Sequence, residues 1–185
     1  NVCPGVVSSI GSDINSDLNF SAEIETGGWE SFPCQDEFAE ETYLPDGSGV
    51  SYETSITLDC FGESQVLQNV NDILSVDINM EHSYSGDLDI ILTSPNGVEV
   101  ILFEQAGGST WLGQATDNDA SEELVGIGSD YGWSMNPDYN GTMAEAMLAG
   151  NTITLDNLNT VAGGTGQSLI SSTYEPVGDF NDFLG

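Results

Sequence analysis

The sequence predicts an all-β fold, a β-sandwich of the jelly-roll type, and three observations support this prediction. Several short segments alternate apolar with polar residues, a pattern that is typical of strands with one buried face. Stretches rich in Gly, Pro, Asn and Ser separate these segments, as turns do. The chain has 185 residues, which is enough for one sandwich core with an extension but short for two full domains.

The first predicted strand covers residues 18–24. Its inward-facing residues are Leu18, Phe20, Ala22 and Ile24. The stretch before it has a weak helical spacing but fits a loop or a short strand equally well. Gly27-Gly28 and Pro33 then interrupt the chain. We therefore divide the sequence into an N-terminal extension with one amphipathic strand, residues 1–39, and a β-sandwich, residues 40–185.

Within the sandwich, residues 52–60 and 74–82 alternate in the same way and are predicted strands. Residues 88–93 and 98–103 flank the tetrapeptide Ser94-Pro95-Asn96-Gly97. Pro and Asn-Gly supply the backbone angles that a tight reversal needs. We expect a β-hairpin at this position.

A long loop is predicted over residues 105–137, which are rich in Gly, Asp and Asn. Loops of this length in compact domains are usually functional or ordered by a metal. After the loop, residues 142–149 are expected to form one short helical turn closed by Gly150. Residues 152–158 follow as another strand.

The charge of the chain has one sign. The sequence contains 31 Asp and Glu residues and no Lys or Arg, so self-repulsion must be relieved by solvent, counter-ions or bound metal. Specific cation binding is one explanation, and solubility in a salty or protease-rich medium is the other. Nucleic acid and anionic membranes are excluded as expected partners, because their phosphates are bound through Lys and Arg.

Three cysteines, Cys3, Cys34 and Cys60, in a Gly-, Ser- and Thr-rich β sequence favour an oxidising compartment. We prefer a disulfide between Cys34 and Cys60, and the spacing leaves all three pairings open. The sequence also has no apolar run long enough to span a membrane. We therefore expect a secreted protein, extracellular or at a cell surface, without membrane insertion.

Residues 78–90 read Ile-Asn-Met-Glu-His-Ser-Tyr-Ser-Gly-Asp-Leu-Asp-Ile, and residues 92–97 read Leu-Thr-Ser-Pro-Asn-Gly. This order of a strand ending in His, a short turn, Gly-Asp-Leu, an apolar strand and Ser-Pro-x-Gly resembles the signature of the P-domain in proprotein convertases. The resemblance extends over about residues 40–185, in the form found in secreted multidomain surface proteins of gliding-type bacteria. It implies a jelly-roll-like domain without catalytic activity.

The sequence departs from the family pattern at two places. Ser85 precedes Gly-Asp-Leu, where convertases commonly carry a basic residue. The chain also stops after residues 180–185, before the last strands of the family. We therefore expect a sandwich that is incomplete at its C-terminus and completed by the strand at 18–24 or by a neighbouring chain. A clipped or unfinished chain is the plain alternative.

Catalysis by a Ser-His-Asp arrangement would depend on His82, the one histidine of the chain. His82 ends an alternating apolar face, and the resemblance places it in the scaffold, so we interpret it as structural. No motif places a catalytic pair of carboxylates. One His and three dispersed Cys also disfavour zinc. The sequence predicts a protein that is not an enzyme.

Calcium is the expected cofactor, because Ca²⁺ takes six to eight oxygen ligands and acids cluster in the Gly-rich loop. The loop contains Asp117, Asp119 and Asp130. The resemblance implies cation ligands at the matching positions and a strand that begins at Asp87 beside the loop. We predict these four residues as ligands, with solvated loop acids and a turn-capping Asp87 as the alternative. Weaker candidates are Asp89 and Glu122.

These features predict a non-catalytic extracellular interaction or structural module, stabilised by calcium. Its expected partners are copies of itself, as in a self-assembling surface or filament subunit, or other domains of a larger secreted protein. The first alternative is an accessory domain that stabilises a secreted subtilisin-like protease. The second is a carbohydrate-binding module, although anchoring in the core or a loop is the preferred role for most aromatics. The aromatics considered for sugar stacking are Trp29, Trp111, Tyr131, Trp133 and Tyr139.

Overall fold

The structure is a computed structural model, and it describes residues 6–11, 18–24, 34–40, 42–44, 50–58, 61, 65–116, 125–159 and 163–184. For the strands before residue 42, only the backbone is described. Among the helices of these residues, none is long and apolar enough to cross a membrane.

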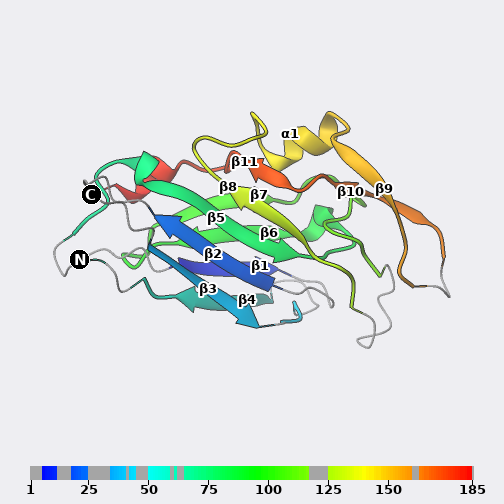
Figure 1. Cartoon of the computed structure of the whole chain (residues 1–185), viewed down its shortest axis with the longest axis horizontal. Coiled ribbons are helices and arrows are strands. Elements are labelled where there is room, and N and C mark those ends of the chain that lie inside the picture. The colour runs from blue at the N-terminus through cyan, green and yellow to red at the C-terminus, as the bar shows by residue number, and fades with distance from the viewer. Residues whose placement is uncertain are drawn as a thin grey trace.

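The described residues form two larger sheets and one two-stranded ribbon (Figure 1). The four-stranded sheet consists, in order, of β4 (Ser51–Ile56), β1 (Val6–Gly11), β6 (Asp89–Thr93) and β7 (Glu99–Glu104). The five-stranded sheet consists, in order, of β11 (Ser172–Tyr174), β8 (Ser129–Trp133), β5 (Ile73–Met80), β2 (Leu18–Ile24) and β3 (Cys34–Glu40). The ribbon pairs β9 (Thr152–Asp156) with β10 (Thr165–Leu169).

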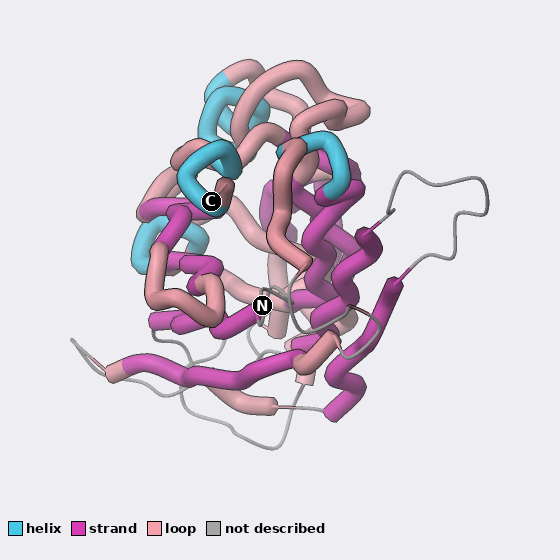
Figure 2. Tube along the Cα trace, turned by 90° about the vertical axis from the view of Figure 1, so that its left-hand side faces the viewer, coloured by secondary structure: helices cyan, strands magenta, loops and turns pink. Residues whose placement is uncertain are grey.

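Four short helices complete the described part. They are the 3₁₀ helices η1 (Val70–Asp72), η2 (Ser85–Asp87) and η3 (Phe180–Phe183) and the α-helix α1 (Met143–Leu148). In the side view of Figure 2, the helical turns lie mainly in the upper half of the molecule.

One apolar cluster joins the two larger sheets. Val76 and Ile78 of β5 are buried in it together with Ile90 and Leu92 of β6. Buried and partly exposed positions alternate along β5 from Val76 to Met80, as expected for a strand with one face on the core. The predicted all-β sandwich is therefore confirmed.

Two strands from the beginning of the sequence lie inside the sheets. β2 lies between β5 and β3 and pairs Asn19 with Asn79. β1 lies between β4 and β6 and pairs Val7 with Thr93. The strand predicted at 18–24 thus forms with the expected bounds. It pairs with strands of its own chain, which is the first of the two ways in which the sandwich was expected to be completed. The undecided stretch before it contains β1, and the division after residue 39 stays a prediction.

The disulfide between Cys34 and Cys60 also stays a prediction. Cys34 begins β3, but its side chain lies outside the described part of the structure, as do Cys3 and Cys60. A quantification of free thiols is the direct test of the pairing.

The predicted hairpin forms between β6 and β7. Its turn is closed by Gly97 N, which donates to Ser94 O at 2.8 Å, and by Ser94 N, which donates to Val98 O at 2.8 Å. Gly97 has a φ of 79°, a left-handed conformation that glycine adopts without a steric penalty. The hairpin prediction is confirmed.

The prediction of one loop over residues 105–137 was wrong at its C-terminal end. β8 lies there and pairs with β5. Tyr131 and Trp133 of β8 are buried, and the glycine between them is not a turn residue. A Cβ at Gly132 would lie 2.2 Å from Oδ1 of Asp77, so glycine leaves room for the side chain of the neighbouring strand.

The short helix forms as predicted, while two later strands were missed. Thr142 and Glu145 make a reciprocal capping box at the start of α1, and Gly150 follows the helix with a φ of 76°. The strand predicted at 152–158 ends earlier, at Asp156. No strand was predicted for β10 or β11, whose short segments are rich in small polar residues.

Candidate functional site

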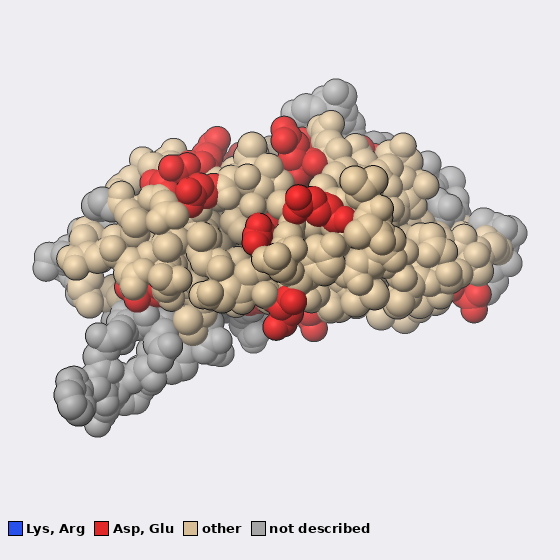
Figure 3. All heavy atoms as spheres, turned by 90° about the horizontal axis from the view of Figure 1, so that it is seen from above, with Lys and Arg blue, Asp and Glu red and all other residues tan. Residues whose placement is uncertain are grey.

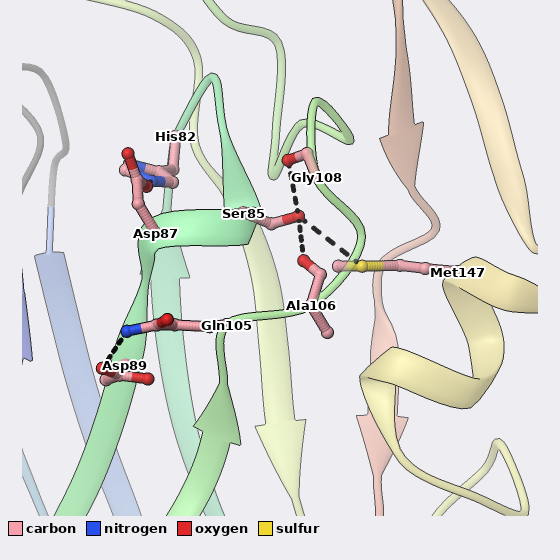
Figure 4. A network of polar contacts seen from close by, with 8 residues as sticks. All are labelled: His82, Ser85, Asp87, Asp89, Gln105, Ala106, Gly108 and Met147. Atoms are coloured by element: carbon pink, nitrogen blue, oxygen red, sulfur yellow. Dashed lines mark hydrogen bonds and ion pairs between the residues drawn. The ribbon is translucent and has the colours of Figure 1, made fainter.

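The candidate site is the turn between β5 and β6, where the signature residues lie (Figure 4). Its backbone is bonded to the segment that follows β7. His82 and Leu112 exchange two hydrogen bonds of 2.9 Å, and Ser85 N donates to Thr110 O at 3.1 Å. Gly86 N donates to Gly108 O at 3.0 Å. These bonds attach the turn to residues 108–112 along its whole length.

His82 and Asp87 contact each other across the turn. The distance between His82 Nε2 and Asp87 Oδ1 is 2.9 Å, and the side chains are 1% and 44% exposed. A carboxylate only accepts hydrogen bonds, so the contact places a proton on Nε2. His82 Nδ1 is buried and has no hydrogen-bond partner among the described residues. The ring is thus held in the scaffold, with Asp87 at its exposed end.

Ser85 has a different set of partners. Its side chain is fully buried, and Oγ donates to Ala106 O at 2.7 Å and lies 3.6 Å from the sulfur of Met147. Figure 4 shows the Ser85 hydroxyl and the His82 ring on opposite sides of η2. A nucleophile needs its base within hydrogen-bond reach, so this Ser, His and Asp do not form a catalytic triad.

Two glycines allow the turn to pack this closely. A Cβ on Gly86 would lie 2.8 Å from Cα of Gly108, and a Cβ on Gly107 would lie 2.2 Å from the sulfur of Met147. Gly107 also has a φ of 81°, which side-chain-bearing residues rarely adopt. The Gly of the Gly-Asp-Leu motif is therefore required by a close backbone approach.

A second polar contact holds the adjacent strand ends. Gln105 Nε2 donates to Asp89 Oδ2 at 2.9 Å, and Gln105 N donates to Leu88 O at 2.9 Å. Gln105 has a φ of 22°, an uncommon conformation for a residue other than glycine. The remaining oxygen of Asp89 is buried without a hydrogen-bond partner among the described residues.

The predicted calcium ligands are only partly described. Asp87 contacts His82, and Asp130 Oδ1 accepts a bond of 2.6 Å from Asn79 Nδ2. The two carboxylates therefore have different hydrogen-bond partners, and neither of these bonds involves the other carboxylate. Asp117, Asp119 and the weaker candidate Glu122 lie outside the described residues, and the residues that are described contain no group of three His, Cys, Asp or Glu able to hold a metal. The four-ligand site stays a prediction.

Nothing in the sequence pattern indicated the polar role of Tyr131. Its hydroxyl accepts a bond of 2.8 Å from Gly113 N and donates to Leu169 O at 3.0 Å. Burial raises the pKa of the Tyr131 phenol above its ordinary value. The alternation of Tyr131 and Trp133 in the sequence was the available signal for a buried strand at this position.

Carboxylates lie on the face that Figure 3 shows, in small groups separated by neutral residues and without any basic side chain. This distribution follows from the composition, since the whole sequence lacks Lys and Arg. Any cation on this surface must come from solvent or from a partner.

Comparison with known proteins identifies the segment that contains the turn. The family model of the proprotein convertase P-domain matches residues 72–126, so the resemblance is confirmed over β5, η2, β6 and β7. The P-domain is a non-catalytic accessory domain of proprotein convertases. No curated protein and no solved structure match the chain. The resemblance to bacterial surface proteins stays a prediction.

Proposed function

We propose that this chain is a non-catalytic docking module of a larger secreted protein, built on a P-domain-like sandwich. One observation carries the proposal: the segment that matches the P-domain supplies strands of both larger sheets. The matched part is thus the structural centre of the domain, and its polar turn residues bond to other parts of the same chain.

The geometry of the turn supports a module without catalysis. His82 is held by Asp87, and Ser85 is buried against Ala106. The sequence has no other histidine, so a second His-based nucleophile–base pair is not available. The turn is suited to holding a rigid surface rather than to activating a nucleophile.

The match to the P-domain favours docking to another domain, including a secreted subtilisin-like protease, over self-assembly. β2 already lies beside β5, in a position that a strand of a neighbouring copy would otherwise take. Sugar stacking receives less support, because Trp111, Tyr131 and Trp133 are buried and a stacking platform needs exposed rings.

Calcium remains part of the proposal. Carboxylates are suitable ligands for Ca²⁺, and Asp87 and Asp130 each use one oxygen in the bonds given above. Calcium at one hundred times its dissociation constant would stabilise the fold by about 2.7 kcal/mol. Thermal unfolding with millimolar Ca²⁺ and with a chelator measures this. Equal midpoints would exclude a stabilising calcium site.

The docking function is tested in the full-length protein that contains this chain. Calorimetry compares the unfolding of the neighbouring domain in the intact protein and after deletion of residues 1–185. If the module is docked, its deletion should lower the unfolding temperature of the neighbouring domain, because the interface stabilises both partners. Unchanged unfolding of the neighbour would show that the two domains are independent.

A further inference from the structure

A surface pocket lies between the end of β8 and the segment that leads into η3. Its volume is about 430 Å³, within the range of ligand pockets. Met135, Pro176 and Val177 form an apolar part of its lining, while Glu175 and Asp179 contribute carboxylates. The pocket therefore combines an apolar wall with negative charge.

The backbone around this pocket is held in place by hydrogen bonds. Val177 N and Gly178 N donate to Leu102 O and Ile101 O of β7 at 3.3 and 2.7 Å. Ser134 N on the opposite side donates to Tyr174 O at 3.0 Å. The pocket is thus formed before any partner arrives, which lowers the entropic cost of binding.

The carboxylate of Asp179 is fixed at the start of η3. It accepts bonds of 2.8 Å from Asn181 N and 2.7 Å from Asn181 Nδ2. These bonds hold the pKa of Asp179 below its ordinary value, so the group is charged at neutral pH. Glu175 also lines the pocket and is exposed. The sequence contains no Lys or Arg to neutralise either acid.

We propose that the pocket receives a Lys or Arg side chain from the neighbouring protein domain. A long basic side chain has an aliphatic stem and a charged head. The stem matches Met135, Pro176 and Val177, and the head matches Glu175 and Asp179. This inference rests on the proposed docking function and specifies the chemistry of one contact within it.

The probe for this contact is N-acetyl-arginine amide, with N-acetyl-citrulline amide as its neutral counterpart of nearly equal shape. Both are titrated into ¹⁵N-labelled protein at physiological salt, which screens attraction to distant acids. We expect saturable shifts of the Val177, Gly178 and Asn181 amide signals with the arginine probe. The citrulline probe should leave these signals unchanged.

Matched substitutions distinguish the effect of the two pocket carboxylates on binding from the effect of the overall negative charge. Glu175→Gln and Asp179→Asn each remove one charge, and Asn retains the ability to cap η3. Each should weaken binding about threefold and the double variant about tenfold, as expected for ion pairs at a partly exposed site. The control pair, Glu53→Gln and Asp156→Asn, removes two exposed charges elsewhere and should change affinity less than about twofold.

Three results would overturn the inference: no saturable shift, equal binding of citrulline, or equal weakening by the control pair. A failure here is distinguishable from a failure of docking. If deletion of the module destabilises its neighbour while the arginine probe does not bind, the contact chemistry is wrong and the docking function stands. If the probe binds and the deletion has no effect, the pocket stands and the docking function is wrong.

Discussion

Replacing Tyr131 by Phe removes one oxygen atom from a buried position on β8. The ring is retained, so the substitution tests the two hydrogen bonds of the hydroxyl rather than the packing of the side chain. These bonds join Tyr131 to Gly113 N and to Leu169 O. Tyr131 is 1% exposed, so water cannot easily replace either partner.

The expected loss follows from the groups that stay behind. Leaving a buried donor or acceptor unsatisfied costs about 1 to 3 kcal/mol. Gly113 N loses the partner described above, whereas Leu169 O keeps a weak contact of 3.4 Å with the Ser168 hydroxyl. We therefore expect the free energy of unfolding to fall by about 2 to 4 kcal/mol.

Urea denaturation at fixed salt measures this change. With a slope near 2 kcal/mol per M, the midpoint should fall by about 1 to 2 M without a change in slope. Tyr84→Phe is the matched control, because Tyr84 is 47% exposed and should lose less than about 0.5 kcal/mol. Equal midpoint shifts in the two variants would refute the assignment of Tyr131 as a buried polar link.

Three further predictions concern the turn and the response to pH. A double-mutant cycle with His82→Gln and Asp87→Asn should give a coupling of about 0.5 to 1 kcal/mol, because Asp87 is 44% exposed; strictly additive losses would show that the contact contributes nothing. Gly107→Ala should destabilise the fold by about 1 to 3 kcal/mol more than Gly108→Ala. Both glycines have a positive φ, but only at Gly107 would a Cβ meet another atom within 4 Å. Equal urea midpoints of the two variants would show that backbone strain alone, and not the close contact at Gly107, determines the loss. Burial raises the pKa of the Tyr174 phenol, so the folded state holds this proton more tightly than the unfolded chain does. The resulting stability should be fully present below about pH 10 and should fall as the pH rises further. Urea midpoints that stay level above about pH 10 would contradict this.

The sequence was sufficient to locate strands whose alternation is uninterrupted. β2 and β5 were found because their apolar residues recur at every second position, as in a strand with one buried face. β8 was missed because its five residues lie in a stretch rich in Gly, Asp and Asn, a composition that predicted a loop. The reason for Gly132 within this strand is the side chain of Asp77 on the adjacent strand, and a contact between residues so far apart in sequence is not visible in the local pattern.

The candidate site was predictable to a similar degree. The structural role of His82 follows from its place at the end of an apolar face, and the structure shows its contact with Asp87. The pocket at residues 134–135 and 175–181 was not predicted, because its lining comes from two separated segments that only the folded sheets bring together. Local spacing likewise does not specify which residues lie near the loop acids Asp117 and Asp119 in space.

The position of β1 has a consequence for the order in which the domain can form. β1 pairs with β4 on one side and with β6 on the other, so Val7 must meet Thr93 before the four-stranded sheet is continuous. During synthesis, the first strand therefore remains without its second partner until β6 has left the ribosome. Pairings between such distant residues carry a large loop-closure entropy and slow the folding reaction. In refolding experiments, protection of the β1 amides should therefore appear late, together with that of β6.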